Sequence, residues 1–488
     1  MAENKRESMS SVDVAWLRMD RPGNLMVICG VLVLRERITL ARLRSTIASR
    51  LLRFQRFRQR PLRTLQSLSG FQWKTDERFD LERHVREAAL PRSAGDVELE
   101  ALVSKLVATP LESRHPLWQF DLVANYKGGS AVVLRIHHCY ADGIALIQVL
   151  LSMTDTDRAG SVRPAPARAA ARADAEDDLL SQLTVSLGSA LEMASRAASA
   201  LIDKGAQLWR DPPKALALAE QGGAVAAELV KLALMREDSP TRFKGKPGAT
   251  KRVAWADPIP LDEVKVVGRA LGASVNDVLL SSVAGALRAY LVRRGDAVDG
   301  VVIRALVPVN LRPLEQAYRL GNKFGLVFLE LPIGIENPVE RLYAVRANMR
   351  SLKGSYQPVI ALGILAAMGA GPHLLQERLL AMLAKNATAV MTNVPGPQHA
   401  LYLAGARIDR LMFWVPQSGD IGMGVSIMTY AGEVQFGLIA DRSLCPHPER
   451  VIEQFADEFE KLVLATLLSP WPWPEPPTAA QIERAAVA

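Results

Sequence analysis

Short apolar runs and amphipathic stretches alternate along most of this chain of 488 residues. In the first third, apolar runs at 26–34 and 131–136 predict buried strands, and helical spacing predicts helices at 40–52 and 99–107. Beyond residue 250 we expect strands at 251–255, 301–308, 324–331, 389–392, 424–430 and 433–439, and helices at 261–271, 275–292 and 447–467. This mixture predicts an α/β fold with mixed sheets flanked by helices.

A change of composition separates two halves of the chain. Residues 154–178 consist mainly of Ala, Arg, Asp and Pro, which leaves too few apolar side chains for a core and predicts a solvated linker. Alanine-rich stretches at 179–208 and 213–235 predict helices that pack across the junction. We therefore expect an N-terminal domain over 1–153, a linker with connecting helices over 154–245 and a C-terminal domain over 246–488.

Composition and charge narrow the class of protein. Charged residues make up 23% of the chain, which argues against an integral membrane protein. The longest apolar run, 359–371, is also shorter than the roughly 20 residues of a membrane-spanning helix. The net charge of +8 favours anionic lipid surfaces or phosphorylated substrates. Nucleic acid is not expected, because neither an arginine–aromatic recognition pattern nor zinc-finger spacing is present.

The cysteines and the N-terminus indicate a cytoplasmic protein. Cys29, Cys139 and Cys445 are too few and too scattered for a disulfide framework, which predicts a reducing compartment. Residues 1–9 are polar and lack the apolar core of a secretory signal. We expect a location in the cytoplasm, peripheral to the inner membrane or to lipid inclusions.

The segment that points to chemistry is His137-His138-Cys139-Tyr140-Ala141-Asp142-Gly143. It lies between a predicted strand and an apolar run that opens a helix, where rigid elements can hold a side chain at the edge of a cavity. An imidazole at this place can be neutral near pH 7 and take a proton from a hydroxyl or an amine. The carboxylate four residues after His138 can fold back and fix the loop.

This motif resembles the HHxxxDG signature of the bacterial wax ester synthase/acyl-CoA:diacylglycerol acyltransferase family. The signature is shared with condensation domains and other chloramphenicol acetyltransferase-like proteins, but further blocks in the same order narrow the resemblance. They are Met9-Ser10-Ser11-Val12-Asp13, Pro116-Leu117-Trp118, Ser239-Pro240-Thr241-Arg242-Phe243, Ser274-Val275-Asn276-Asp277-Val278, Val307-Pro308-Val309-Asn310-Leu311-Arg312, Gly321-Asn322 with Leu331-Pro332, and Thr392-Asn393-Val394-Pro395-Gly396-Pro397. The segment 25–30 departs from the family pattern.

The resemblance implies two chloramphenicol acetyltransferase-like domains with the active site at their interface. It also implies transfer of a long-chain acyl group from acyl-CoA to a fatty alcohol, giving a wax ester, or to diacylglycerol, giving triacylglycerol. The expected partners are acyl-CoA, the lipid acceptor and a membrane or lipid-droplet surface, with the protein a monomer or homodimer. No cofactor and no metal are expected, since acyl-CoA is a substrate.

The motif residues receive different expected roles. His138 fits a general base acting without a covalent intermediate, rather than a core histidine satisfied by backbone groups. His137 is adjacent on a strand and would point to the opposite face, as a structural or helper residue. Asp142 can cap the following helix, while the family resemblance implies a carboxylate that pairs with an arginine. Gly143 is expected to let the loop turn without a Cβ clash.

Four residues outside the motif complete the expected site. Asn276 and Asp277 begin a predicted helix and fit a helix cap by pattern alone, whereas the resemblance places Asn276 near the acyl group or oxyanion with Asp277 supporting it. Trp118 is expected to form packing and a channel wall, and Asn393 to lie in a tight loop near the site. Four basic residues are candidates for the phosphates of CoA or for an anionic lipid surface: Lys244, Lys246, Lys251 and Arg252.

Two other functions stay open at this point. One is an acyltransferase of the condensation-domain type that takes carrier-protein thioesters, although no carrier-protein segment is visible in the chain. The other is a catalytically inactive lipid-surface protein, which the intact His138 and Asp142 disfavour.

Overall fold

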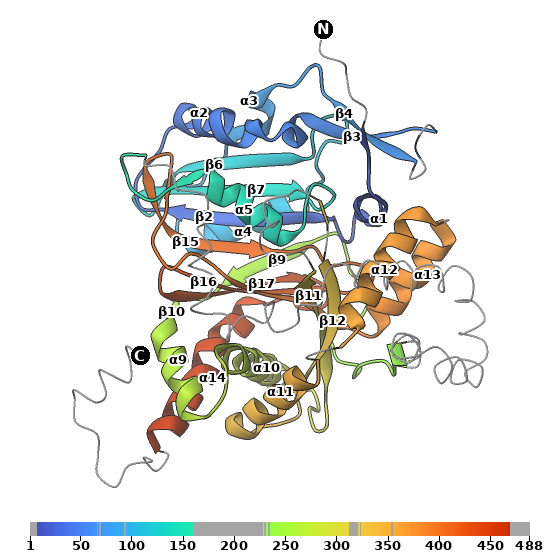
Figure 1. The fold of residues 1–488 in the computed structure, drawn as a ribbon. Coiled ribbons are helices and arrows are strands. Elements are labelled where there is room, and N and C mark those ends of the chain that lie inside the picture. The colour runs from blue at the N-terminus through green and yellow to red at the C-terminus, as the bar shows by residue number, and fades with distance from the viewer. Residues whose placement is uncertain are drawn as a thin grey trace.

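Two seven-stranded mixed sheets and a small three-stranded sheet organise the chain (Figure 1). The computed structural model describes residues 7–65, 67, 70–91, 94–160, 228, 231–232, 235–311, 321–322, 324–352, 355–371 and 373–468. The predicted linker beyond residue 160, the helix expected at 179–208 and most of that expected at 213–235 lie outside the described residues.

The first sheet has the strand order β5-β6-β7-β2-β15-β14-β8. Its strands are β2 (Val27–Leu34), β5 (Val85–Glu87), β6 (Trp118–Tyr126), β7 (Gly129–His137), β8 (Thr154–Asp155), β14 (Tyr402–Leu403) and β15 (Ala406–Trp414). The helices of this half are α1 (Ser11–Met19), α2 (Leu40–Arg50), α3 (Leu81–His84), α4 (Asp96–Val107) and α5 (Gly143–Ser152). Every residue of β7 is buried, because helices or other strands cover both faces of this central strand.

The second sheet has the order β10-β17-β16-β13-β11-β12, with β9 also paired to β17. Its strands are β9 (Lys251–Trp255), β10 (Ile259–Pro260), β11 (Ile303–Asn310), β12 (Phe324–Leu331), β13 (Ala389–Pro395), β16 (Met423–Tyr430) and β17 (Glu433–Asp441). Its helices are α9 (Leu261–Ala270), α10 (Val275–Arg293), α11 (Pro338–Leu352), α12 (Gln357–Ala370), α13 (His373–Lys385) and α14 (Glu449–Leu468). The predicted α/β fold with mixed sheets is confirmed, and β9 and β12 have the predicted bounds.

A strand crossover joins the two halves. β15 pairs with β2 of the first sheet, and β14 pairs with β8, although both strands come from the range assigned to the C-terminal domain. Residues 154–155, expected to begin the linker, form β8 of the same sheet. The division at residue 246 therefore does not follow the strand pairing, because pairing between residues hundreds of positions apart leaves no local signal in the sequence.

Helix packing closes the same junction from another side. α1 of the first half lies against α12 of the second, and a Cβ at Gly369 would come within 1.6 Å of the Ser11 carbonyl oxygen. The two backbones can touch there only because residue 369 is glycine. The largest hydrophobic cluster contains residues of both halves, from Met9 to Tyr430, so one continuous core holds them together.

One helix satisfies the length and hydropathy of a membrane span. It is α10, the only such helix among the residues that the structure describes, and 83% of its apolar window is buried within the protein. It lies among α9, α11 and α14 (Figure 1). We therefore assign α10 as the core helix of the second half.

A buried ionic network also links the halves. The Lys251 ammonium donates to Asp441 Oδ2 at 3.2 Å and to Asn24 Oδ1 at 2.9 Å, and Asn24 in turn donates to the Gly419 carbonyl at 2.7 Å. Lys251 and Asp441 are almost fully buried. Burial lowers the pKa of Lys251, and the neighbouring Asp441 opposes that shift.

Replacing Lys251 with methionine should destabilise the fold. The Asp441 carboxylate would stay buried without its cation, so we expect the free energy of unfolding to fall by about 3 kcal/mol. Chemical denaturation followed by circular dichroism measures this change. Lys265→Met, which removes an ion pair with the exposed Asp262, is the control and should cost less than about 1 kcal/mol. Equal stability of the two variants would show that the buried pair of Lys251 and Asp441 does not stabilise the fold.

Candidate active site

The histidine motif forms a tight connection between β7 and α5. β7 ends at His137 and α5 begins at Gly143. The His138 amide donates to the Met26 carbonyl at 2.7 Å, which ties the loop to the start of β2. The Tyr140 hydroxyl donates to the Gln59 carbonyl at 2.6 Å and accepts from the Leu117 amide at 2.9 Å. These bonds hold the loop in one conformation.

The His138 ring lies between two aromatic side chains. It stacks on Trp16 of α1 with ring centroids 4.0 Å apart and planes at 18°, and its centroid is 5.6 Å from that of Phe324 in β12. His138 is 3% exposed. Burial lowers the pKa of His138 to about 3, although its own carbonyl and Asn322 act in the opposite direction. The imidazole is therefore neutral at neutral pH.

The C-terminal half of the chain contacts the loop between β7 and α5 through Asn322. Its Nδ2 donates to the His138 carbonyl at 2.9 Å and to Asp13 Oδ1 of α1 at 2.8 Å. Gly321 forms a parallel bridge with Ala141 of the loop. Burial raises the pKa of Asp13, while the bond from Asn322 acts against this shift. Three segments far apart in the sequence thus meet at the backbone of His138.

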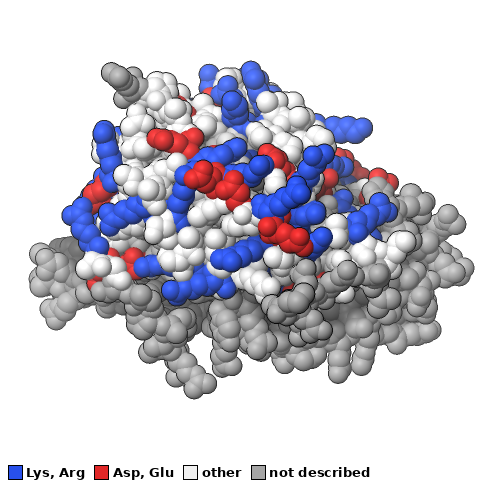
Figure 2. Space-filling view, turned by 90° about the horizontal axis from the view of Figure 1, so that it is seen from above, with Lys and Arg blue, Asp and Glu red and all other residues white. Residues whose placement is uncertain are grey.

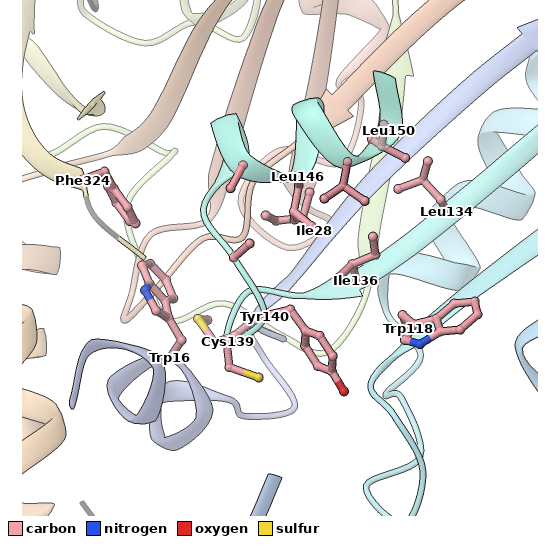
Figure 3. Close-up of a cluster of buried hydrophobic side chains, with 14 of the residues drawn as sticks. Trp16, Ile28, Trp118, Leu134, Ile136, Cys139, Tyr140, Leu146, Leu150 and Phe324 are labelled. Carbon is pink, nitrogen blue, oxygen red and sulfur yellow. The ribbon is translucent and has the colours of Figure 1, made fainter. Parts of the chain in front are cut away.

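A large apolar cavity opens beside the imidazole. Its empty volume is about 1170 Å³, part of it open to solvent. Ile28, Leu134, Leu146 and other apolar side chains of the first half line one side (Figure 3). Side chains of β11, β12, β13 and β16 line the other side, including Leu306, Phe324, Val390 and Met428. The cavity lies at the junction of the two halves, as predicted.

Comparison with known protein families agrees with this arrangement. Residues 9–279 match the model of the wax ester synthase/diacylglycerol acyltransferase catalytic domain, and residues 320–463 match the WS/DGAT C-terminal domain. The chain belongs to this family. It is an acyltransferase, and the resemblance identified from the sequence blocks is confirmed.

Relatives and solved structures extend the match over most of the chain. A protein of Mycobacterium tuberculosis named as a diacylglycerol O-acyltransferase is 33% identical over 424 residues, covering 83% of this chain and 80% of the relative. The WS/DGAT structure from Marinobacter aquaeolei VT8 covers 95% of this chain and 100% of its own, with a TM-score of 0.67 and 20% identity. A starter condensation domain of rhizomide synthetase shares the fold, with a TM-score of 0.55, 14% identity and 94% coverage of each chain.

In this WS/DGAT protein the two residues that end the motif have structural roles. Asp142 caps α5, because its carboxylate accepts from the Ala145 amide at 2.9 Å. Its pairing with an arginine stays a prediction. Gly143 does not serve the expected turn: it is the first residue of α5 and has no positive φ. A Cβ at Gly143 would meet no atom within 4 Å, and Gly143 lines the cavity, so the glycine leaves that space open.

The two amides predicted near the site are brought together. Asn393 Nδ2 donates to Asn276 Oδ1, and Asn393 lines the cavity. It belongs to strand β13 and pairs with Ile427 of β16, so the expected tight loop is wrong at this residue. Asp277 belongs to a capping box, in which its Oδ2 accepts from the Ser274 amide at 3.0 Å. The helix-cap interpretation therefore describes Asp277, whereas Asn276 contacts a cavity residue. A role of Asn276 at the oxyanion stays a prediction.

Trp118 lies in the core and not on the cavity wall. It begins β6, donates from Nε1 to the Phe57 carbonyl at 2.8 Å and stacks on His84. Figure 3 shows Trp118 on the far side of Tyr140 and Ile136 from Trp16. The expected channel wall is wrong at this residue, because its position on the strand directs the indole into the packing between β6 and α3.

His137 and Cys139 also face the protein interior. His137 Nδ1 accepts from the Cys139 amide at 3.1 Å, and its Nε2 is 3.7 Å from Asp20. It is fully buried and absent from the cavity lining, which agrees with a structural role. Burial raises the pKa of the Cys139 thiol well above its usual value, which removes the thiolate that a nucleophile needs.

Sequence reasoning missed the aromatic and amide residues around His138. Trp16 and Phe324 carry no chemical signature, although Trp16 lies only three residues after the N-terminal family block. Asn322 belongs to one of the family blocks, but no role for its side chain was predicted from the sequence. Of the basic candidates for CoA, Lys251 is buried against Asp441, and Lys244 forms an ion pair with Asp238. These two cations are already neutralised and are poor phosphate ligands.

Asn322→Ala should slow the reaction without unfolding the protein. The His138 carbonyl and the Asp13 carboxyl would lose their shared donor, so the loop and ring would lose part of their positioning. We expect kcat to fall by about 10- to 100-fold, with KM changed by less than about threefold. Steady-state kinetics measure both values.

Asn337→Ala is the matched control, since Asn337 accepts from the amides that begin α11, far from the cavity. A similar loss of kcat in both variants, or a change confined to KM, would show that Asn322 does not position His138.

Proposed function

We propose that this protein transfers a long-chain acyl group from acyl-CoA to the hydroxyl of a fatty alcohol or a diacylglycerol, with His138 as the general base. The observation that carries the proposal is the neutral imidazole of His138 at the wall of a large apolar cavity between the two halves. An apolar cavity that opens to solvent suits lipid chains, and a neutral imidazole can accept a proton.

The burial of the ring supports a direct transfer. His138 Nδ1 is fully buried, so we assign Nε2 to the substrate side. Nε2 takes the hydroxyl proton as the alcohol oxygen attacks the thioester carbon. The carbon–sulfur bond then breaks, and the proton passes from the imidazolium to the leaving thiolate of CoA. No covalent acyl-enzyme and no cofactor take part.

The low pKa of His138 fits this direct mechanism. Burial disfavours the imidazolium, but negative charge develops on the thioester oxygen as the alcohol attacks. That charge stabilises the imidazolium in the transition state, where a dry site strengthens the attraction. Amide donors that line the cavity, such as Asn393, are candidates to bind the same oxygen.

The cellular setting belongs to the same proposal. We place the protein in the cytoplasm, peripheral to the inner membrane or lipid inclusions, as a monomer or homodimer. The alternative donor, a carrier-protein thioester, has support from the fold shared with condensation domains. Matches to the WS/DGAT family over most of the chain favour acyl-CoA.

Replacing His138 with alanine tests the base. With palmitoyl-CoA and either hexadecanol or dipalmitoylglycerol, we expect thiol release to fall by about 10²- to 10⁴-fold. Comparing the two acceptors in the wild type ranks the alcohol against the diacylglycerol. His115→Ala is the control, since His115 is outside the cavity and pairs with Asp76. Normal turnover in a folded His138→Ala protein would exclude the proposed mechanism.

The pH dependence of the wild type provides a separate check. Because the pKa of His138 is lowered to about 3, the neutral base is fully present from neutral pH down to well below pH 6. We expect kcat/KM to show no step near pH 6.5 and to decline only toward the lowest pH at which the protein stays folded. Circular dichroism at each pH defines that limit. A single protonation with a pKa near 6.5 that abolishes activity would argue against this assignment.

A further inference from the structure

The net positive charge of this protein arises in one segment, residues 35–87. Residues 35–87 contain 14 Lys and Arg against six Asp and Glu, which gives +8, the net charge of the whole chain. The other 435 residues contain 45 basic and 45 acidic residues. Within 37–75 there are ten basic residues and no acidic one. A concentration of this kind creates a local positive potential in a protein that is otherwise balanced.

These residues form one face of the molecule. They come from α2, the short 3-10 helices at Leu51–Arg53 and Gln55–Arg58, and the strands β3 (Gln59–Arg63) and β4 (Phe71–Thr75). This part lies at the top of Figure 1, and Figure 2 shows it from above with Lys and Arg side chains spread over it and fewer Asp and Glu side chains between them. We define the arginine face by six residues: Arg37, Arg42, Arg53, Arg58, Arg60 and Arg63.

The charges of the arginine face are available to a partner. Arg44, Arg50 and Arg56 of the same segment form ion pairs with Glu82, Asp155 and Glu7. In contrast, none of the six residues of the arginine face forms an ion pair with a described residue, and all except Arg60 are exposed. Unpaired guanidinium groups are well suited to phosphate oxygens.

An apolar side chain accompanies the charges. Leu65 follows β3 in the loop of the β3–β4 hairpin, two residues after Arg63, and is fully exposed. No aromatic residue of 35–87 is among the exposed large hydrophobic side chains of the described residues. Arginines beside an exposed leucine suit a lipid interface, whereas single-stranded nucleic acid is usually bound on exposed aromatic rings.

The arginine face is connected to the wall of the cavity. Arg50, in the same segment, donates to the Met153 carbonyl at the end of α5. Leu51 belongs to the same hydrophobic cluster as Leu146 and Leu150, which line the cavity from α5. The segment that carries the arginine face is therefore packed against the helix that borders the substrate space.

We propose that the arginine face docks the protein on an anionic phospholipid surface, with Leu65 entering the apolar edge of the bilayer. The preference for lipid over nucleic acid rests in part on the proposed function, whose substrates are insoluble lipids. Binding then places the enzyme where its acceptor is concentrated.

Vesicle flotation with the full chain tests this proposal. The probes are vesicles of phosphatidylcholine alone and of phosphatidylcholine with about one third phosphatidylglycerol. The wild type should bind only the anionic vesicles, and raising NaCl from about 0.1 M to about 0.5 M should weaken binding. Each arginine near such a surface contributes about fivefold, so Arg53→Gln/Arg58→Gln/Arg63→Gln should lose at least about tenfold in binding. Leu65→Ser should weaken binding several-fold with little effect on its salt dependence.

The matched control removes three charges from the opposite side of the molecule. Arg293, Arg350 and Arg450, on α10, α11 and α14, are exposed and form no ion pair within the described residues. The variant Arg293→Gln/Arg350→Gln/Arg450→Gln should bind within about twofold of the wild type. Equal losses of vesicle binding in the two triple variants would contradict the proposed docking surface. Equal binding of the wild type to neutral and anionic vesicles would contradict it as well. So would a gel shift with RNA or duplex DNA in the absence of vesicle binding.

A soluble assay separates this proposal from the proposed function. Thiol release with palmitoyl-CoA and a short water-soluble alcohol should be unchanged in the arginine triple variant. Its loss in that variant would show that these residues serve the reaction and not docking. Absence of turnover in the wild type, together with charge-dependent vesicle binding, would contradict the proposed acyltransferase reaction and leave the docking surface supported.

Discussion

The burial of one neutral imidazole is the constraint on which the site depends. His138 can be held dry only if aromatic rings cover it and if the polar backbone of its loop is satisfied from elsewhere. Trp16 and Phe324 provide the cover, and Asn322 satisfies the His138 carbonyl. Trp16 lies more than 300 positions before Asn322 and Phe324 in the chain. The site therefore exists only when both halves are packed together, so its integrity is a tertiary property and not a property of the motif.

The apolar cavity and the net positive charge lie in separate parts of the molecule. The cavity is lined largely by apolar side chains, and the glycine at position 143 leaves room at its edge. The surplus of positive charge is outside the cavity, on the segment 35–87. An enzyme for insoluble acceptors needs both features, because an apolar site alone does not bring the protein to a lipid surface. The charge of Lys251, by contrast, is buried in an ion pair with Asp441.

The sequence predicted elements best where the signal was local. The bounds of β9 and β12 were correct because each apolar run ends at polar or turn residues. β15 was missed because its partner β2 is nearly 400 residues away, and nothing near β15 records that pairing. At the site, His138 was found through its motif, but Gly143 was misjudged because a glycine that begins a helix and a glycine in a turn look alike in sequence. Trp118 was misplaced because a strand pattern does not say which layer covers each face.

The crossover of β15 has a consequence for synthesis of the chain. When residues 1–160 have left the ribosome, the first sheet still lacks β14 and β15, so β2 presents an open edge next to its apolar neighbours. About 250 further residues must be made before that edge is covered. The N-terminal half is thus exposed to wrong strand pairing for much of translation, and an isolated fragment ending at the linker would retain the same open edge. Residues that look like two successive domains share one sheet and one hydrophobic core.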